Sequence, residues 1–377
     1  MSWDIAGMGA ISSIGDDPEQ IFDALCAGRA GRAPLRAFDP ASYRMRYAYE
    51  IADRRERGRD EPMRATRWLG TAVAQALADA GLEPDVGAVP VLVGTTLREQ
   101  RSAELWWRDG TRFELGDLHF GAALRARFGG ASSFTFANAC CAALYALALA
   151  SDLIELGISD TVVAAGTDSI AESTYGMLDR VQNDTPHAAR PFDVERKGMV
   201  MGEGAVAVVL RRAGTGSPNV YARLRGVGIN CDAYHATAPD PAGIAHVIAD
   251  AQQRAGVRAS DIDLVMLHGT GTQLNDQVEA EVLAKLFAGT PNAPFLTAIK
   301  SMTGHTLGGS GLLSLVIAAL CMRHGKVPPI HGLTDPIAAA AGLHLVRDKA
   351  VVADIATAQI NAFGFGGINA VAVLAAA

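Results

Sequence analysis

Short apolar runs alternate along this chain with longer segments in which apolar residues recur every three or four positions. The short runs predict strands over 3–11, 89–94, 133–137, 161–165, 205–210, 220–229, 264–267, 295–298, 357–361 and 370–374. The longer segments predict helices over 18–27, 64–80, 140–156, 242–255, 276–287 and 308–322. Alternation of strands and helices predicts an α/β fold in which the strands are buried between helical layers.

Two stretches of the second half of the chain resemble stretches of the first. The strand at 133–137 leads through a short turn into an apolar helix, and the strand at 295–298 does the same. "DIAGMGAISS" (4–13) and "RLRGVGINCD" (223–232) are both strands interrupted by Gly-x-Gly. We therefore expect two fused halves of similar design, 1–218 and 219–377, joined near 211–219.

Composition narrows the function classes. The 377 residues are 49% hydrophobic and carry a formal net charge of −7, and Lys and Arg form no stripe, so we expect no nucleic-acid partner. The N-terminus lacks the pattern of a secretory signal, and the apolar runs at 139–150 and 311–322 are too short to span a bilayer, which predicts a cytoplasmic protein without a membrane segment. The five cysteines have no zinc-ligand spacing, so we expect neither a metal nor a disulfide framework.

The segment "NACCAALY" places two cysteines at the start of an apolar helix, beginning with Cys140. A thiol at this position faces unpaired backbone N–H groups, which we expect to lower its pKa and to make it a nucleophile. Taken alone, the segment is better explained as a tightly packed helix start. The rest of the chain has to decide between these interpretations.

Three further segments carry candidate chemistry. "HGTGT" puts His268 at the end of a buried strand, above a loop whose glycines admit a ligand and whose hydroxyls, Thr270 and Thr272, can hold a polar chain. "KSMTGHT" places Lys300 and His305 between an apolar strand and an apolar helix, where a polar group needs a partner or a purpose.

The last segment is "NAFGFGGINA" (361–370), which combines three glycines with two phenylalanines. It is either a β-bulge with core aromatics or a gate whose backbone N–H points into a site.

The order of these four segments resembles the β-ketoacyl synthase family, and the resemblance covers nearly the whole chain. "ARPFDVERKGMVMGEGAVAVVL" (189–210) and "CDAYHATAPDP" (231–241) are similar to two further blocks of that family. The resemblance implies a thiolase-like fold, with two duplicated βαβαβαββ-type halves in a layered α-β-α-β-α arrangement. The first half would carry the nucleophilic cysteine, and the second the two histidines and the lysine.

The resemblance also assigns roles to residues. Cys140 aligns with the nucleophile, although Asn138 stands where the family commonly has Thr, and it gives Cys141 no role. The other matching catalytic residues are His268, His305 and Lys300, the lysine acting electrostatically. Backbone amides of Cys140 and Phe365 would form an oxyanion hole. The gate would comprise Gly364, Phe365 and Gly366, set by a pair formed by Arg190 and Asp232. Thr270 and Thr272 match hydroxyls that hold the phosphopantetheine arm.

The implied reaction is a decarboxylative Claisen condensation. An acyl group moves from an acyl carrier protein (ACP) to the cysteine, and malonyl-ACP then loses CO2 and extends the acyl chain. The resemblance implies no metal and no tightly bound cofactor, since phosphopantetheine arrives on the carrier. It also implies a homodimer, or a heterodimer with a related chain-length subunit. Chain length would depend on that partner or on pocket side chains, for which Trp106, Trp107 and Phe113 are candidates.

One departure from the family bears on function. Ser314 stands where the family usually has a Glu that supports the lysine, which should change the charge balance at Lys300. We therefore expect a specialised synthase, of type II polyketide or fatty-acid type. An acyltransferase without decarboxylation and a non-catalytic chain-length subunit are the alternatives, and the presence of Cys140 argues against the latter.

Overall fold

The computed structural model describes residues 2–377 except 57, 86, 88, 130–131, 217–218 and 292. In this described part, ten strands form one sheet: β1 Trp3–Ser12, β4 Val91–Gly94, β5 Ser133–Phe136, β6 Thr161–Asp168, β7 Gly204–Arg212, β8 Ala222–Cys231, β9 Leu264–Met266, β10 Phe295–Thr297, β13 Thr357–Gly364 and β14 Ile368–Ala375. Two small hairpins are formed by β2 Ala33–Pro34 with β3 Tyr47–Ala48, and by β11 Lys326–Val327 with β12 Val351–Val352.

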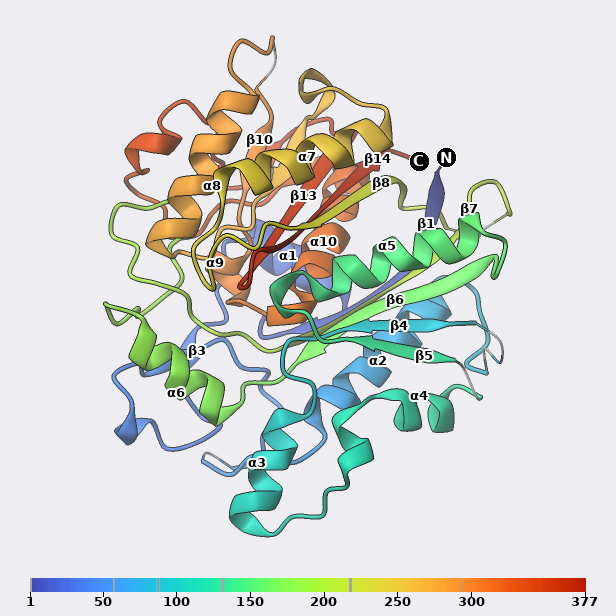
Figure 1. Cartoon of the computed structure of the whole chain (residues 1–377), viewed down its shortest axis with the longest axis vertical. Helices are drawn as coiled ribbons and strands as arrows, with labels where there is room; N and C mark the ends of the chain where they lie inside the picture. Colours follow the sequence, from blue (N-terminus) through green and yellow to red (C-terminus); the bar gives the residue numbers. More distant parts are fainter. Residues whose placement is uncertain are drawn as a thin grey trace.

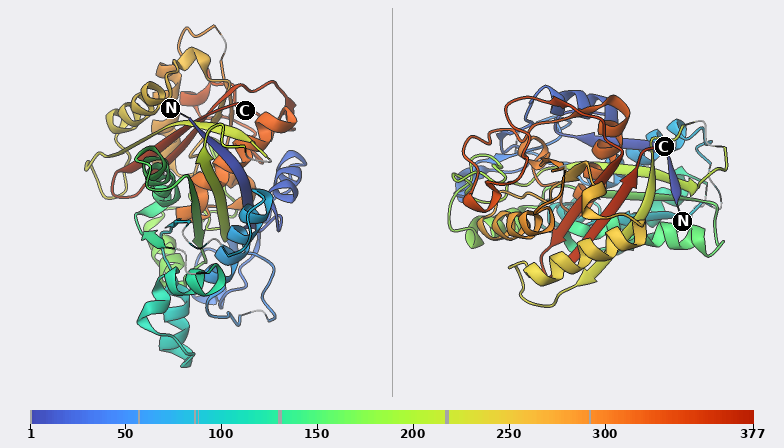
Figure 2. Two further views of the ribbon diagram at one scale, coloured as in Figure 1. Left: turned by 90° about the vertical axis from the view of Figure 1, so that its right-hand side faces the viewer. Right: turned by 90° about the horizontal axis from the view of Figure 1, so that it is seen from above.

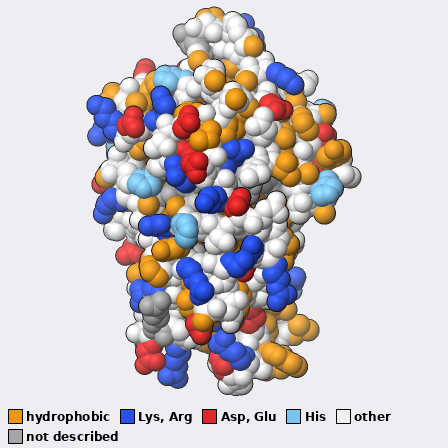
Figure 3. Space-filling model, turned by 90° about the vertical axis from the view of Figure 1, so that its left-hand side faces the viewer, with side chains coloured by type: hydrophobic (Ala, Val, Ile, Leu, Met, Phe, Trp, Pro, Cys, Tyr) orange, Lys and Arg blue, Asp and Glu red, His pale blue; other side chains and the backbone are white. Residues whose placement is uncertain are grey.

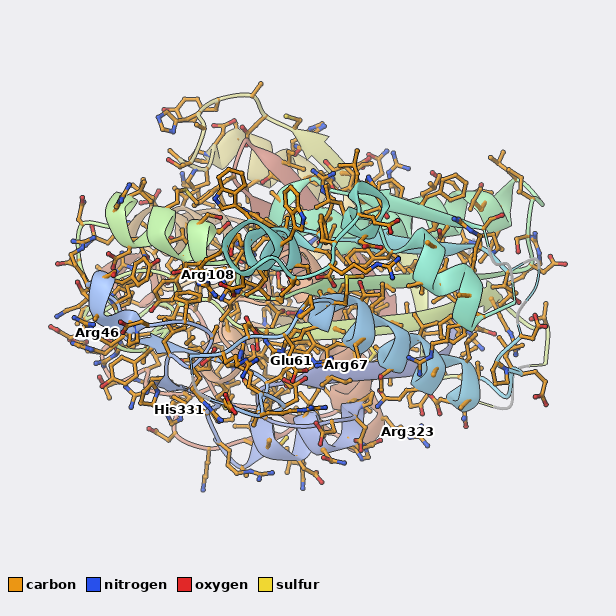
Figure 4. All side chains as sticks on the ribbon, turned by 90° about the horizontal axis from the view of Figure 1, so that it is seen from below. Arg46, Glu61, Arg67, Arg108, Arg323 and His331 are labelled. Carbon is orange, nitrogen blue, oxygen red and sulfur yellow. The ribbon has the colours of Figure 1, made fainter. Side chains whose placement is uncertain are left out.

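The α-helices are α1 Pro18–Cys26, α2 Arg64–Asp79, α3 Gln100–Asp109, α4 Gly121–Arg127, α5 Ala142–Glu155, α6 Glu172–Val181, α7 Pro241–Ala255, α8 Gln273–Leu286, α9 Lys300–Thr303 and α10 Ser310–His324. Every strand and helix predicted from the sequence is present within a few residues. The helices that were not predicted are α3, α4, α6 and the single turn α9. Arg108 on α3 forms an ion pair with Glu172 on α6 (2.9 Å), which ties two of these together (Figure 4).

The strand order repeats. The sheet runs β10-β9-β13-β14-β8-β1-β7-β6-β4-β5, so each half, taken outward from the centre, contains its first, fifth, fourth, second and third strand. The directions repeat as well, with two antiparallel pairings followed by two parallel ones. The halves join where Trp3–Ile5 pairs with Ala222–Leu224. The expected boundary at residue 218 lies outside the described residues.

The two halves of the sheet form two separate layers. Helices α5 and α10 lie between these layers and further helices cover their outer faces, which gives the α-β-α-β-α arrangement (Figures 1 and 2). Strand β7 shows how the layers form: Val206, Val208 and Leu210 enter the core around α5 and α10, whereas Ala205, Ala207 and Val209 enter the core against α2. A third core lies under α7 and α8 on the outer face of the second half. Figure 1 shows α7 running along β8, β13 and β14.

The central helix α10 has no polar face because it is buried on all sides from Ser310 to Cys321. Among the described residues, the stretch Leu307–His324 is the one helix long and apolar enough to cross a membrane, and 83% of it is buried inside the fold. Burial of this kind is typical of the core helix of a soluble protein.

This topology brings chemistry-bearing residues to one edge of the sheet. Cys140 follows β5 and leads into α5, and His268 follows β9. Lys300 and His305 lie between β10 and α10, and Phe365 follows β13. The carboxyl ends of parallel strands in an α/β sheet are where ligands usually bind.

The first turn of α5 packs directly on the end of β4. A Cβ at Gly94 would lie 2.1 Å from the Ala143 nitrogen, so Gly94→Ala must push the helix away from the strand. We predict that this substitution lowers the free energy of unfolding by about 1–3 kcal/mol. Urea denaturation measures the loss. Gly116→Ala is the matched control, because no atom lies within 4 Å of its Cβ position. Equal stability of the two variants would contradict the packing.

Candidate active site

A strained turn presents Cys140. After β5 the chain makes a single 3-10 turn, Ala139–Cys141, in which Ala139 has the left-handed φ of 60°. This turn is why α5 begins at Ala142 rather than at the predicted Cys140. The Cys140 side chain is 8% exposed and lines a cavity of about 250 Å³. Such a turn between a strand and a helix is the local geometry of a nucleophile elbow.

The neighbouring Cys141 has a different environment. It is fully buried, and its sulfur lies 2.8 Å from the carbonyl oxygen of Ile368 and 3.2 Å from that of Ala362. The thiol therefore fastens the turn to β13 and β14. Burial raises its pKa well above the ordinary value.

Opposite charges hold the backbone of His268 on both sides. Its N–H donates to Glu279 Oε1 (2.8 Å), and its carbonyl oxygen accepts from Lys300 Nζ (2.6 Å). The other Glu279 oxygen accepts from the Gly269 N–H (2.9 Å). The imidazole Nδ1 has no hydrogen-bond partner among the described residues and the ring lines the same cavity as Cys140.

The tautomer of His305 follows from its neighbours. The Leu307 N–H donates to His305 Nδ1 (3.1 Å), so the neutral ring carries its proton on Nε2. Nε2 is buried without a partner among the described residues. The His268 and His305 rings are nearly perpendicular, with centroids 5.5 Å apart. The cavity thus contains an unused N–H donor beside a second imidazole.

Both imidazoles are neutral. Burial, with the Lys300 charge adding to it, holds the pKa values of His268 and His305 well below the usual range. Burial also lowers the pKa of Lys300 to about 8, and the Glu279 carboxylate is the strongest influence that opposes this change. At pH 7 the ammonium group is therefore still mostly protonated.

The expectation that the pKa of Cys140 is lowered is wrong for the net shift, although the backbone N–H groups at the turn act in the expected direction. Burial raises this pKa to about 11, and the Asp168 carboxylate adds to the rise. Lys300 and the backbone N–H of Phe365 oppose it but are outweighed. The resting sulfur is accordingly a protonated thiol, and it needs a base when it attacks.

The glycine-rich loop after β13 lies across the mouth of the cavity. Phe365 is 42% exposed, and its backbone N–H lies near enough to the Cys140 sulfur to lower the pKa of the thiol. A Cβ at Gly364 would touch both Ala139 Cβ and Cys141 Sγ at 3.3 Å, so this glycine lets the loop lie on the cysteine turn. Gly366 adopts a φ of 84° and donates its N–H to the Ala236 carbonyl oxygen (2.8 Å).

The expected pairing of Arg190 with Asp232 is not formed. Arg190 binds Asp193 (3.0 Å) and the Thr334 hydroxyl (3.1 Å), because the fully buried Asp193 supplies a carboxylate within the same chain segment. Asp232 instead accepts from Asn369 Nδ2 (3.1 Å), which joins it to β14. Asp232 also donates its N–H to the Gly367 carbonyl oxygen (2.9 Å), so it contacts the loop after β13 without the arginine.

Thr270 and Thr272 line the cavity, with their hydroxyl oxygens 2.9 Å apart. The lining of the cavity includes Leu178, Val181, Lys197 and Leu274. Figure 3 shows the molecule from the side on which α6, α8 and α9 lie in Figure 1, and Lys and Arg side chains are scattered among hydrophobic ones on this face.

The suggested chain-length residues are placed elsewhere. Trp106 and Trp107 on α3 are 50% and 83% exposed, and neither they nor Phe113 belong to the described cavity lining. The aromatic pair faces outward because the inner side of α3 is taken by Arg101, which binds the buried Asp60 at 3.0 Å.

Two buried carboxylates at the site were not predicted to be functional. Glu279, on α8, is the carboxylate that acts most strongly on Lys300, while Ser314 is buried on α10. Asp168 ends β6 and accepts hydrogen bonds from the Thr95–Leu97 loop. For Asp168 the one sequence signal was a charged residue at the end of an apolar strand, and Glu279 had no such signal. Among the described residues, no group of His, Cys, Asp or Glu is arranged to hold a metal ion.

The fold has two repeated five-stranded halves, and the cysteine turn of the first half packs against β13 and β14 of the second. These features define a thiolase-like α/β protein. The chain belongs to the β-ketoacyl synthase family: residues 4–215 match the N-terminal domain of beta-ketoacyl synthase, and residues 221–334 match its C-terminal domain. The family and the fold expected from the motifs are thus confirmed.

Relatives match the chain over nearly its full length. It is 30% identical to the 3-oxoacyl-[acyl-carrier-protein] synthase 2 of Coxiella burnetii, over 98% of this chain and 97% of that protein. It is also 30% identical to the enzyme of the same name from Synechocystis, over 97% and 95%.

Solved structures give the same result. The ishigamide ketosynthase/chain length factor superposes with a TM-score of 0.89 at 30% identity, covering 100% of this chain and 99% of that chain. A beta-ketoacyl synthase from Burkholderia phymatum superposes with a TM-score of 0.86 at 26% identity, with the same coverage.

The raised pKa of Cys140 leads to a prediction for chemical labelling. Because only the thiolate reacts, the rate of Cys140 alkylation by iodoacetamide should rise about tenfold per pH unit from pH 7 to 10. Peptide mass spectrometry measures the rate at each pH, with the exposed Cys231 as an internal comparison. A plateau of the Cys140 rate near pH 7 would show a stabilised thiolate and contradict the assignment.

Proposed function

We propose that the protein is a β-ketoacyl-ACP synthase that catalyses decarboxylative Claisen condensation of an acyl thioester with malonyl-ACP. The observation that supports this most strongly is the shared cavity: Cys140 lines it together with two neutral imidazoles, and the proton on His305 Nε2 has no other acceptor among the described residues. A nucleophile that must be acylated and a donor that must stabilise an enolate are the two requirements of this reaction.

In the loading step, the Cys140 sulfur attacks the carbonyl carbon of an acyl-ACP thioester. The thiol proton passes to a neutral imidazole and then to the departing pantetheine sulfur, so the enzyme is left as an acyl thioester. The backbone N–H groups of Cys140 and Phe365 donate to the oxygen of the tetrahedral intermediate. The effect of the Phe365 N–H on the pKa of the Cys140 thiol supports this assignment, because it places that N–H near the sulfur.

In the condensation step, malonyl-ACP loses CO2, and the electron pair of the broken bond forms an enolate. The His305 Nε2–H and the His268 ring donate to the enolate oxygen, which requires that His268 also carry a proton toward the cavity. The enolate carbon then attacks the acyl carbonyl, the bond between carbon and the Cys140 sulfur breaks, and the departing thiolate takes up a proton from solvent to restore the thiol. Burial keeps both rings neutral, and the charge of Lys300 adds to this effect.

The carrier arm and the partners follow from the same reaction. Thr270 and Thr272 would hold the phosphopantetheine arm that the carrier brings, and no tightly bound cofactor is required. Phe365, between Gly364 and Gly366, would gate its access. An acyl carrier protein is the expected partner, and we expect the protein to act in the cytoplasm.

We further propose that the chain functions as two halves, 1–218 with Cys140 and 219–377 with the histidines and Lys300. The protein works as a homodimer or with a related chain-length subunit. Its likeness to the ishigamide ketosynthase/chain length factor supports a role in a type II polyketide or specialised fatty-acid pathway.

The test of this function is CO2 release from malonyl-ACP in the presence of acyl-ACP. A synthase releases CO2 and forms a β-ketoacyl product. Acylation of Cys140 without CO2 release would instead identify an acyltransferase, and absence of both would identify a non-catalytic subunit.

The two adjacent cysteines provide a matched pair of variants. We predict that Cys140→Ala abolishes acyl loading, whereas Cys141→Ala still loads, because the Cys141 sulfur is turned toward the carbonyl oxygens of β13 and β14. Intact-protein mass spectrometry after incubation with acyl-ACP detects the added mass. Loading that survives Cys140→Ala would refute the nucleophile.

The two steps should also separate at His305. His305→Ala removes the N–H donor, so we predict that CO2 release falls by about 100-fold or more while loading of Cys140 changes much less. Both rates can be measured on the same preparation by quench-flow. An equal, large loss of both steps would contradict this division of roles.

A further inference from the structure

Asp168 is a fully buried carboxylate that the reaction described above does not use. Its oxygens accept from the Thr95 hydroxyl (2.7 Å) and from the N–H groups of Thr96 (2.9 Å) and Leu97 (2.7 Å), all in the loop after β4. A fourth donor comes from the other half of the molecule, the N–H of Gly308 (2.7 Å). One side chain therefore joins a loop of the first half to the start of α10.

Close packing accompanies these hydrogen bonds. A Cβ at Gly308 would lie 2.5 Å from the backbone of Thr95, so the start of α10 rests directly on the loop. The residue before Gly308 is Leu307, whose N–H donates to His305 Nδ1 and whose φ of 50° bends the turn. Two consecutive N–H groups thus connect the Asp168 carboxylate to the ring that carries the unused Nε2 proton.

We infer that Asp168 is a positioning residue for His305: it anchors the Leu307–Gly308 turn, and this turn sets the tautomer and the orientation of the imidazole in the cavity. A carboxylate suits this task because it accepts several N–H bonds at once and has no hydrogen of its own to repel them. The kinetic part of this inference rests on the proposed condensation. The structural part, the state of the His305 ring, does not.

Asp168→Asn is the direct test, since it keeps the shape but turns an NH2 group toward N–H donors. We expect loading of Cys140 to change little and CO2 release to fall by about 100-fold, because a small displacement of a catalytic group is costly. In a His305→Ala background the same substitution should cause no further loss, since its effect acts through the ring. Equal losses of both steps, or losses that multiply in the double variant, would overturn the inference.

The ring itself can be observed by 15N NMR of histidine-labelled protein, with the His305 signals assigned by comparison with His305→Ala. The wild type should show a protonated Nε2 and an unprotonated Nδ1, and Asp168→Asn should show a mixture of tautomers. An unchanged tautomer would refute the inference even if the protein proves not to release CO2.

Two further variants guard against a general loss of structure. Thr95→Val removes one donor to the carboxylate and should reproduce the pattern more weakly if Asp168→Asn does not fold. Asp263→Asn is the control: Asp263 also accepts two backbone N–H groups, from Ala356 and Thr357, but it precedes β9, at the end of the sheet away from the site. It should leave both steps and the His305 signals unchanged, and a loss of CO2 release as large as that of Asp168→Asn would count against a specific role.

Discussion

The chemistry of this site depends on one buried ammonium group. Lys300 donates to the carbonyl oxygen of His268 at 2.6 Å and lies deep enough to be 3% exposed. A positive charge in a low-dielectric interior acts strongly on its neighbours, so it adds to the burial that keeps two imidazoles neutral, and it favours negative charge on Cys140. Burying this charge without a partner would destabilise the fold. Glu279 on α8 offsets the destabilisation, and three hydrogen-bond donors hold its carboxylate in place.

The duplicated fold explains why these groups can meet. Each half directs the carboxyl ends of its parallel strands to one edge, and the joining of the halves at β1 and β8 sets the two edges side by side. The cysteine therefore comes from one half, and the imidazoles and the ammonium come from the other. The central helices α5 and α10 fix the relation between them, and Asp168 bonds across the same boundary.

Much of this arrangement could be predicted from the sequence, for physical reasons that differ from element to element. The continuous apolar runs of β7 and α10 reflect burial on all sides, and such runs are recognisable in a sequence. The helix α3 was missed because its pattern is inverted, with Arg101 inside and Trp107 outside. Its position depends on an ion pair with Asp60, which lies far from it in sequence.

In the site, too, some features could be predicted from the sequence and others depend on contacts between distant residues. Motif order identified the reactive residues, but the pKa of Cys140 depends on total burial, which a local helix start does not reveal. Arg190 pairs with Asp193 rather than with Asp232 because Asp193 is only three residues away in the chain. The family motif did not indicate this nearer carboxylate. Glu279 and Asp168 act through backbone N–H groups, for which the sequence contains no marker.

The central claim is that two different sets of donors serve the two steps: backbone N–H groups for the acyl oxygen and imidazoles for the enolate oxygen. A crystal structure of the protein acylated on Cys140 tests it most directly. The account predicts an acyl carbonyl oxygen within hydrogen-bond distance of the N–H groups of Cys140 and Phe365, with His268 and His305 left free. An acyl oxygen bound to the imidazoles, or an acyl group on another residue, would contradict it.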